Sequence, residues 1–207
     1  MHRKRFTLPI VAIALAGAVL AGCGSDSGDD TGGGTVAPGD SATTASSNAA
    51  DVEFAQAMIV HHTQAVEMAR MVPANGVSAE LTELAAAVEA AQQPEIDQLT
   101  AMLDRWGADA APTGGGGGGH AGHGGGDTAG MEGMMSAEDM DALAAATGAE
   151  FERLWLTMMI EHHEGAIAMA GTELADGADA EAQALAQTIV DAQQAEITRM
   201  EELLQAS

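Results

Sequence analysis

The chain carries one 12-residue motif twice, and this repetition constrains its fold more than any other feature. The first copy is MIVHHTQAVEMA at residues 58–69, and the second is MIEHHEGAIAMA at residues 159–170. A shift of 101 positions aligns residues 51–106 with residues 152–207 without a gap, and 19 of these 56 pairs are identical. Because length and register both repeat, the sequence indicates an internal duplication, with one repeat at 51–106 and the other within 136–207.

Each repeat predicts a pair of helices and no strand. In the first repeat, the residues expected to face the core recur at a spacing of four and three over about 51–72, which predicts an amphipathic helix. A second amphipathic stretch covers about 78–106. Pro, Asn and Gly between positions 73 and 76 separate the two stretches. The second repeat has the same pattern. Two such hairpins, neither of which buries its apolar stripe alone, predict an all-α, ferritin-like four-helix bundle over residues 49–207.

Two local features modify this bundle. Ser136 and Asp139 have the spacing of a capped helix start, which predicts a short additional helix at about 137–146 before Gly148. Pro94 falls inside the second predicted helix, where it removes a hydrogen-bond donor and favours a kink.

Residues 1–22 have the features of a lipoprotein signal peptide. Three basic residues at positions 3–5 precede an apolar run over 8–20, and Leu-Ala-Gly then leads into Cys23 as in a lipobox. The run is shorter than the roughly 20 residues that a membrane span needs. We therefore expect cleavage before Cys23 and lipidation of that residue, which would anchor the protein outside the cytoplasm on the bacterial cell membrane. An uncleaved anchor is the alternative.

Composition predicts two flexible segments, and charge excludes one class of function. Residues 23–48 form a predicted tether and residues 107–135 a Gly-rich linker, because neither contains enough apolar side chains for a core. Removal of residues 1–22 takes away three of the seven basic residues, which leaves four against 31 Asp and Glu. Such a charge repels nucleic acid and concentrates cations, so binding of nucleic acid through a basic patch is excluded.

The duplicated helices place polar residues where a core is expected. A histidine at a core position costs free energy unless a partner satisfies it, and His61 and His162 both fall on the apolar stripes. Antiparallel packing brings a glutamate of the following helix to about the same level. Imidazole and thioether suit copper, as Cu(I) or Cu(II), with zinc and iron as alternatives. The predicted ligands are His61, His62, His162, His163, Met58, Met159, Glu95 and Glu196.

A second group gives weaker support for metal binding, and each signal has a structural alternative. Methionine stripes are also typical of core packing, and buried glutamines suit hydrogen bonding to ligands better than ligation. Flexible His and Met clusters in the linker are able to take up soft metal without preformed geometry. A core histidine with a glutamate partner is also compatible with a pair that only fixes helix register. The weaker candidates are Met68, Met169, Gln92, Gln193, His120, His123, Met131 and Met134.

At these residues the sequence resembles the family called domain of unknown function 305, a ferritin-like helical group of mostly secreted or periplasmic proteins. The resemblance rests on the Met-Ile-Val-His-His run at 58–62 and the Gln-Gln-Pro-Glu-Ile run at 92–96, with counterparts at 159–163 and 193–197. It implies a four-helix fold and, for the few members with an assigned role, copper binding or copper tolerance. Ferritin-like di-iron sites use a Glu three residues before the His, where both repeats have Met.

The sequence therefore predicts a lipid-anchored extracytoplasmic protein that binds a metal ion, with copper preferred, for buffering, sequestration or tolerance. Two alternatives stay open: a ferritin-like dinuclear-metal oxidoreductase, and a metal-free interaction module of the cell envelope. The expected partners are the metal ion and, through Cys23, the membrane. The chain is expected to be a monomer, or a dimer that exchanges hairpins across the long linker.

Overall fold

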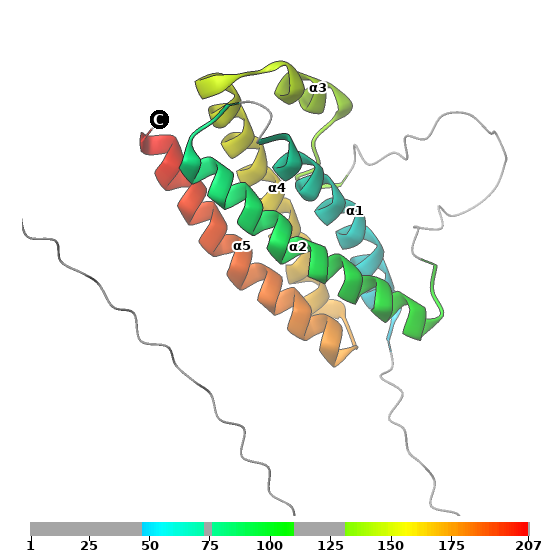
Figure 1. Cartoon of the computed structure of the whole chain (residues 1–207). Coiled ribbons are helices and arrows are strands. Elements are labelled where there is room, and N and C mark those ends of the chain that lie inside the picture. The colour runs from blue at the N-terminus through cyan, green and yellow to red at the C-terminus, as the bar shows by residue number, and fades with distance from the viewer. Residues whose placement is uncertain (1–46, 73–75, 110–130, 207) are drawn as a thin grey trace, which may run out of the picture. The chain divides into compact units, whose positions relative to one another are not determined.

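The computed structural model describes residues 47–72, 76–109 and 131–206, and these residues form five helices and no strand (Figure 1). The helices are α1 (Ala49–Met71), α2 (Ala79–Trp106), α3 (Ala137–Ala145), α4 (Gly148–Asp176) and α5 (Ala180–Ala206). The all-α prediction is confirmed. None of these described helices is long and apolar enough to cross a membrane. The predicted signal peptide, Cys23, the tether, His120 and His123 lie outside the described residues.

Two helical hairpins, α1–α2 and α4–α5, form the bundle, and α1 packs directly against α4 (Figure 1). The backbone N–H of Asp179, just beyond α4, donates to the carboxylate of Asp51 at the start of α1, at 2.9 Å. At the other end, Trp155 near the start of α4 donates its Nε1–H to the carbonyl of Met68 near the end of α1, at 2.9 Å. The two central helices are therefore antiparallel, as a pseudo-twofold relation between the repeats requires.

Side-chain caps begin three of the helices where the sequence places them. Asn48 caps α1 in a reciprocal capping box with Asp51, and Ser78 accepts a hydrogen bond from the start of α2. The predicted box at Ser136 and Asp139 is present and begins α3. Helix α2 continues through Pro94.

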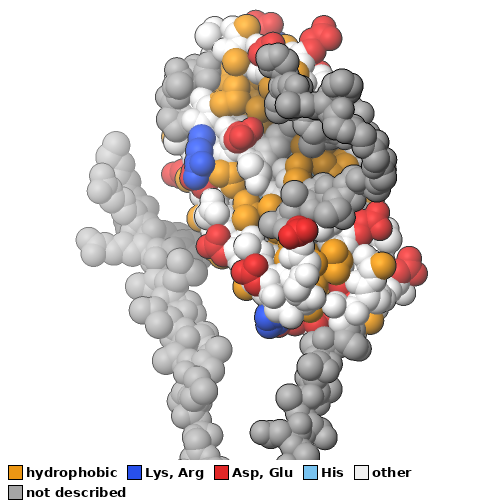
Figure 2. All heavy atoms as spheres, turned by 90° about the vertical axis from the view of Figure 1, so that its right-hand side faces the viewer, with side chains coloured by type: hydrophobic (Ala, Val, Ile, Leu, Met, Phe, Trp, Pro, Cys, Tyr) orange, Lys and Arg blue, Asp and Glu red, His pale blue; other side chains and the backbone are white. Residues whose placement is uncertain are grey.

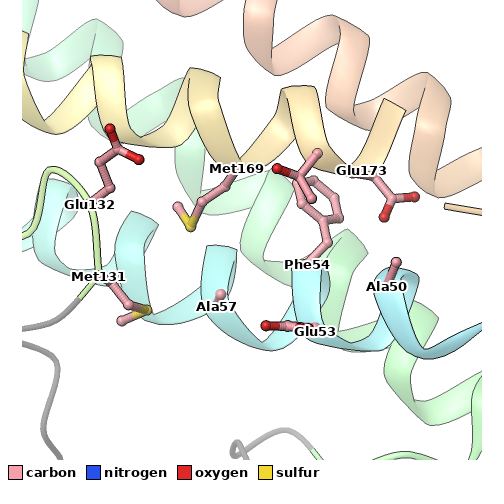
Figure 3. A pocket seen from close by; sticks show the side chains of 9 residues that line it. Ala50, Glu53, Phe54, Ala57, Met131, Glu132, Met169 and Glu173 are labelled. Atoms are coloured by element: carbon pink, nitrogen blue, oxygen red, sulfur yellow. The ribbon is translucent and has the colours of Figure 1, made fainter. Parts of the chain in front are cut away.

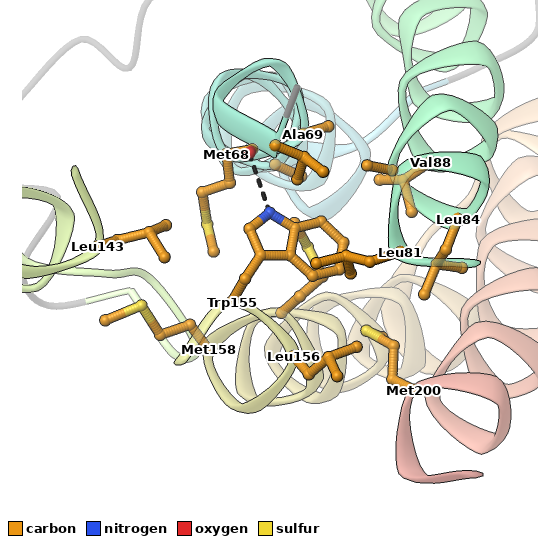
Figure 4. Close-up of a cluster of buried hydrophobic side chains, with 14 of the residues drawn as sticks. Met68, Ala69, Leu81, Leu84, Val88, Leu143, Trp155, Leu156, Met158 and Met200 are labelled. Carbon is orange, nitrogen blue, oxygen red and sulfur yellow. Dashed lines mark hydrogen bonds between the residues drawn. The ribbon is translucent and has the colours of Figure 1, made fainter. Parts of the chain in front are cut away.

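The apolar core consists of two clusters at opposite ends of the bundle. We call the first the Trp155 cluster (Figure 4), in which the fully buried indole packs near Met68, Leu81 and Leu143. At the end of α1 the Val72 N–H donates to the carbonyl of Ala69, three residues back, and not to that of Met68, four residues back. The indole N–H of Trp155 is the donor to the Met68 carbonyl. The second, the Phe54 cluster, contains the residue that the duplication aligns with Trp155.

Three carboxyl groups lie buried at the end of the bundle where α1 begins and α4 ends. Burial alone raises the pKa of Asp51, but hydrogen bonds from the backbone of Asn48, Asp179 and Ala178 outweigh it and lower the pKa. Burial, followed by the hydrogen bond and negative charge of Asp51, raises the pKa of Glu173 from 4.5 to about 8. Glu173 is therefore protonated at neutral pH, beside the ionised Asp51. The third carboxylate, Asp179, accepts from the indole N–H of Trp106 at 3.3 Å.

The raised pKa of Glu173 predicts a specific dependence of stability on pH. Between pH 4.5 and about 8 the unfolded chain releases this proton while the folded chain keeps it, so rising pH favours unfolding. The free energy of unfolding of the wild type, minus that of Glu173→Gln, should fall across this window and stay level above it. Urea unfolding at several pH values measures the difference. A flat difference would contradict the pairing, and Glu164→Gln, an exposed change on the same helix, is the control.

Candidate metal centre

Two histidine side chains meet at the centre of the bundle, where α1 crosses α4. The ring centroids of His61 and His162 are 3.7 Å apart, and the ring planes are inclined by 42°. Both residues have 0% exposure, as do the adjacent His62 and His163. The four imidazoles lie between the Trp155 cluster and the Phe54 cluster, since Met159 belongs to the first and Met58 to the second. The structure thus brings together the four histidines that the sequence predicts.

The central pair is uncharged at neutral pH. Burial, followed by the neighbouring His62, lowers the pKa of His61 from 6.5 to about 3, against the opposing effect of its bond to Glu132. Burial, followed by the nearby His61, holds the pKa of His162 well below its usual range. Neutral imidazole has one nitrogen with a free lone pair, which is the form that binds metal ions.

Three of the four imidazoles are held through Nε2 by an acceptor. His61 Nε2 lies 3.2 Å from the backbone carbonyl of Glu132, His62 Nε2 lies 2.8 Å from Glu95 Oε2, and His163 Nε2 lies 2.7 Å from Glu196 Oε2. A carbonyl or carboxylate oxygen only accepts, so Nε2 carries a proton in each of these rings, and in the neutral His61 Nδ1 carries the lone pair.

The remaining ring nitrogens are buried without partners. Nδ1 of His61, His62 and His163 and both ring nitrogens of His162 have no hydrogen-bond partner among the described residues. Buried polar atoms are normally satisfied, so this concentration of unpartnered ring nitrogens requires an explanation. Histidines that bind metals characteristically donate their other N–H to a carboxylate or a backbone carbonyl, as three of these rings do.

The two glutamates and two glutamines take different places around this centre. Glu95 and Glu196 are predicted as metal ligands, a prediction that the structure does not test; each accepts a hydrogen bond from an outer ring, His62 or His163, with side-chain exposures of 14% and 18%. Gln92 and Gln193 are buried, and their amide groups have no partner among the described residues. Sequence position alone did not distinguish which histidine each glutamate would meet.

The methionines predicted as ligands divide into buried and half-buried groups. Met58 and Met159 have 0% exposure and lie one helical turn before His61 and His162. Met68 is also fully buried, within the Trp155 cluster. The half-buried methionines are Met131, Met134 and Met169.

A short segment that sequence reasoning assigned to the linker contributes to the centre. Residues 131–136, which we call the strap, pass over α1 and α4 beside the histidines. Glu132 supplies the carbonyl that accepts from His61, and Met135 exchanges two backbone hydrogen bonds of 2.8 Å with the side-chain amide of Gln64. A backbone carbonyl has no sequence signature, so no motif pointed to the role of Glu132.

The duplication explains how the strap fits. Gln64 and Gly165 are equivalent positions, one turn beyond their histidines. Gln64 binds the strap with its side chain, whereas Gly165 makes room for it, because a Cβ there would lie 2.1 Å from the backbone oxygen of Glu132. Gly133 in the strap has a φ of +79° and would bring its own Cβ within 2.7 Å of the Glu161 carbonyl. Both glycines are needed for this close approach.

The donors present suit a soft metal ion. No three His, Cys, Asp or Glu side chains in the described ranges are grouped so that they would hold one metal ion. The central donors are instead two neutral imidazoles with orphaned nitrogens and two buried thioethers on the same helices, at Met58 and Met159. Imidazole and thioether together favour copper over hard cations such as Mg²⁺ or Ca²⁺.

Comparisons with known proteins agree with this fold. The family model described as Domain of unknown function (DUF305) matches residues 51–204. A DUF305 protein from Streptomyces coelicolor, described as secreted, is 29% identical to this chain, with a TM-score of 0.66 over 76% of this chain and 93% of the Streptomyces chain. A DUF305 fragment from Deinococcus radiodurans is 31% identical, with a TM-score of 0.66 over 78% and 99%. No curated protein matches the sequence.

The similar solved structures also include CopM, which has been crystallised with Cu(I), Cu(II) and silver and in the apo form. The Cu(I)-bound form is 28% identical to this chain, with a TM-score of 0.60 over 75% of this chain and 96% of CopM. The Cu(II)-bound form is 30% identical, with a TM-score of 0.61 over the same shares.

The close approach at Gly165 predicts opposite effects for two glycine substitutions on α4. Gly165→Ala forces the strap away from the helix and should destabilise the protein by about 1–3 kcal/mol, as overpacking does. Gly171→Ala, whose Cβ meets nothing within 4 Å, should stabilise it by about 0.5–1 kcal/mol through helix propensity. Thermal unfolding measures both, and amide exchange at Met135 should accelerate only in the first. Equal effects at the two positions would contradict the docking of the strap.

Proposed function

We propose that this chain, which belongs to the DUF305 family, binds copper outside the cytoplasm and buffers or sequesters it. The observation that carries the proposal is the pair of buried, neutral imidazoles at the crossing of α1 and α4, with ring nitrogens that no donor or acceptor among the described residues satisfies. Leaving such atoms unsatisfied costs folding free energy, which a bound metal ion would recover.

The residues divide into ligands and groups that orient them. His61 and His162 are the proposed central ligands, with Met58 and Met159 as the neighbouring thioether donors. Glu95 and Glu196 accept from Nε2–H of His62 and His163 and so orient these two rings, whose Nδ1 atoms have no partner among the described residues. The unpartnered amides of Gln92 and Gln193 are available to bond these ligands.

Copper is favoured by the donors and by the related structures. Thioether sulfur prefers Cu(I), and imidazole holds either copper oxidation state, whereas zinc and iron sites usually add thiolate or carboxylate ligands. CopM binds copper in both oxidation states on a similar fold. The surface also attracts cations, because acidic side chains are widespread and basic ones few on the face in Figure 2.

The proposed location follows from the N-terminal sequence and the secreted relative. Cleavage before Cys23 and lipidation of its sulfur would hold the bundle outside the cytoplasm at the cell membrane. In that location copper arrives before it reaches the cytoplasm, which suits a buffering or sequestering role. His120 and His123, which lie outside the described residues, would add further imidazole donors.

Competition with a Cu(I) chelator tests the proposal on the full-length, untagged protein in detergent. His61→Ala/His162→Ala should abolish the tightest copper site, whereas His120→Ala/His123→Ala should leave it intact. Thermal unfolding of each apo variant verifies that it is folded. If wild type and the core variant compete equally well for copper, the buried centre is wrong. Oxygen consumption with Fe(II) identifies the alternative, a dinuclear-metal oxidoreductase.

Replacement of one histidine by an apolar residue separates a functional role from a structural one. His162 has two orphaned ring nitrogens, so His162→Leu should stabilise the apo protein by about 1–3 kcal/mol while it weakens copper binding. Urea unfolding without and with Cu(I) measures both effects. A histidine that serves only to fix helix register would give the same gain in the apo protein but leave copper binding unchanged, because such residues provide specificity at a cost in stability.

A further inference from the structure

A pocket of about 290 Å³ opens beside the histidine centre, between α1, α4 and the strap (Figure 3). Glu132 forms part of its wall, and the backbone carbonyl of the same residue accepts the hydrogen bond from His61. Glu132 therefore borders both the pocket and the buried centre.

Two thioethers line this pocket. Met131 enters it from the strap and Met169 from α4 (Figure 3). Methionine usually fills gaps in a core, but these two side chains are half-buried and border open space. Glu53 on α1 adds an exposed carboxylate, and none of the lining residues is basic.

The duplication shows that this end of the bundle differs from the other at three equivalent positions. Met169 corresponds to Met68, which is fully buried in the Trp155 cluster. Phe54, which lines the pocket, corresponds to the larger Trp155. At this end of the bundle, the smaller side chain of Phe54 and a methionine that borders a cavity thus take the places of two fully buried core side chains.

The third difference places an ionisable group in the pocket wall. Glu173 corresponds to Val72, a fully buried core residue, and is itself only 1% exposed. Its carboxyl oxygens receive no hydrogen bond from the described residues, and its charged neighbours are the carboxylates of Asp51 and Asp179. An ionisable residue in place of a buried valine costs stability, which is expected where a site is built for a ligand rather than for packing.

We propose that the pocket is a second, outer binding site for a soft monovalent metal cation, held by the sulfurs of Met131 and Met169 with the carboxylate of Glu53 at its mouth. Two neutral thioethers select Cu(I) or Ag(I) over hard cations. The identity of the ion rests on the proposed function. The site itself uses none of the histidines and would retain Ag(I) without them.

Ag(I), a stand-in for Cu(I) that undergoes no redox change, tests the proposal on the full-length, untagged protein in detergent. With ¹³C-labelled methionine methyl groups, the signals of Met131 and Met169 should shift as the outer site fills. Met131→Leu/Met169→Leu, which conserves volume, should bind one Ag(I) fewer than wild type. Met140→Leu, a half-buried methionine on α3 outside the pocket, should bind as many as wild type. Met131→Leu alone serves as a second variant if the double variant unfolds.

The outcomes distinguish this site from the buried centre. Unchanged methyl signals, or an unchanged number of ions in Met131→Leu/Met169→Leu, would overturn the outer site. His61→Ala/His162→Ala should retain the methyl shifts of Met131 and Met169 while it loses the buried ion. If the histidine variant loses no ion but the methionine variant does, the outer site stands and the buried centre fails.

Discussion

The structure depends on two uncharged imidazoles in contact at the middle of a helical bundle. His61 and His162 lie 3.7 Å apart with 0% exposure, and burial keeps both neutral. Hydrophobic packing alone does not favour this arrangement, because each ring brings polar atoms into a dry core. The surrounding fold compensates with apolar clusters on both sides and with fixed acceptors for three of the four histidines.

Divergence between the two repeats is as informative as their similarity. The histidines, Glu95 and Glu196 are kept in register, so the centre itself is close to symmetric. The strap breaks that symmetry, since it binds the side chain of Gln64 on one helix and packs against the bare backbone of Gly165 on the other. The two repeats therefore share the residues of the centre, and the differences between them produce a pocket on one side of it.

The helices and the buried faces were predictable from the sequence, because a spacing of four and three determines which side of each helix faces the core. The predicted helix starting at Ser136 also has the expected cap. Which histidine each glutamate would contact was less predictable. Consecutive residues of a helix differ by only about 1.5 Å along its axis and about 100° around it, so only packing decides that Glu95 meets His62 rather than His61. No sequence pattern predicts the hydrogen bond from His61 to the Glu132 carbonyl, because that bond depends on the backbone path of the strap and not on the side chain of Glu132.

The central claim is that the orphaned ring nitrogens are metal ligands, and nitrogen NMR of ¹⁵N-labelled histidine tests it most directly. The apo protein should show Nε2–H tautomers for His61, His62 and His163. On addition of Cu(I), which is diamagnetic, Nδ1 of His61 and a ring nitrogen of His162 should shift strongly while Nε2 of His61 keeps its proton. Unchanged signals from both rings in protein that demonstrably holds copper would contradict the account.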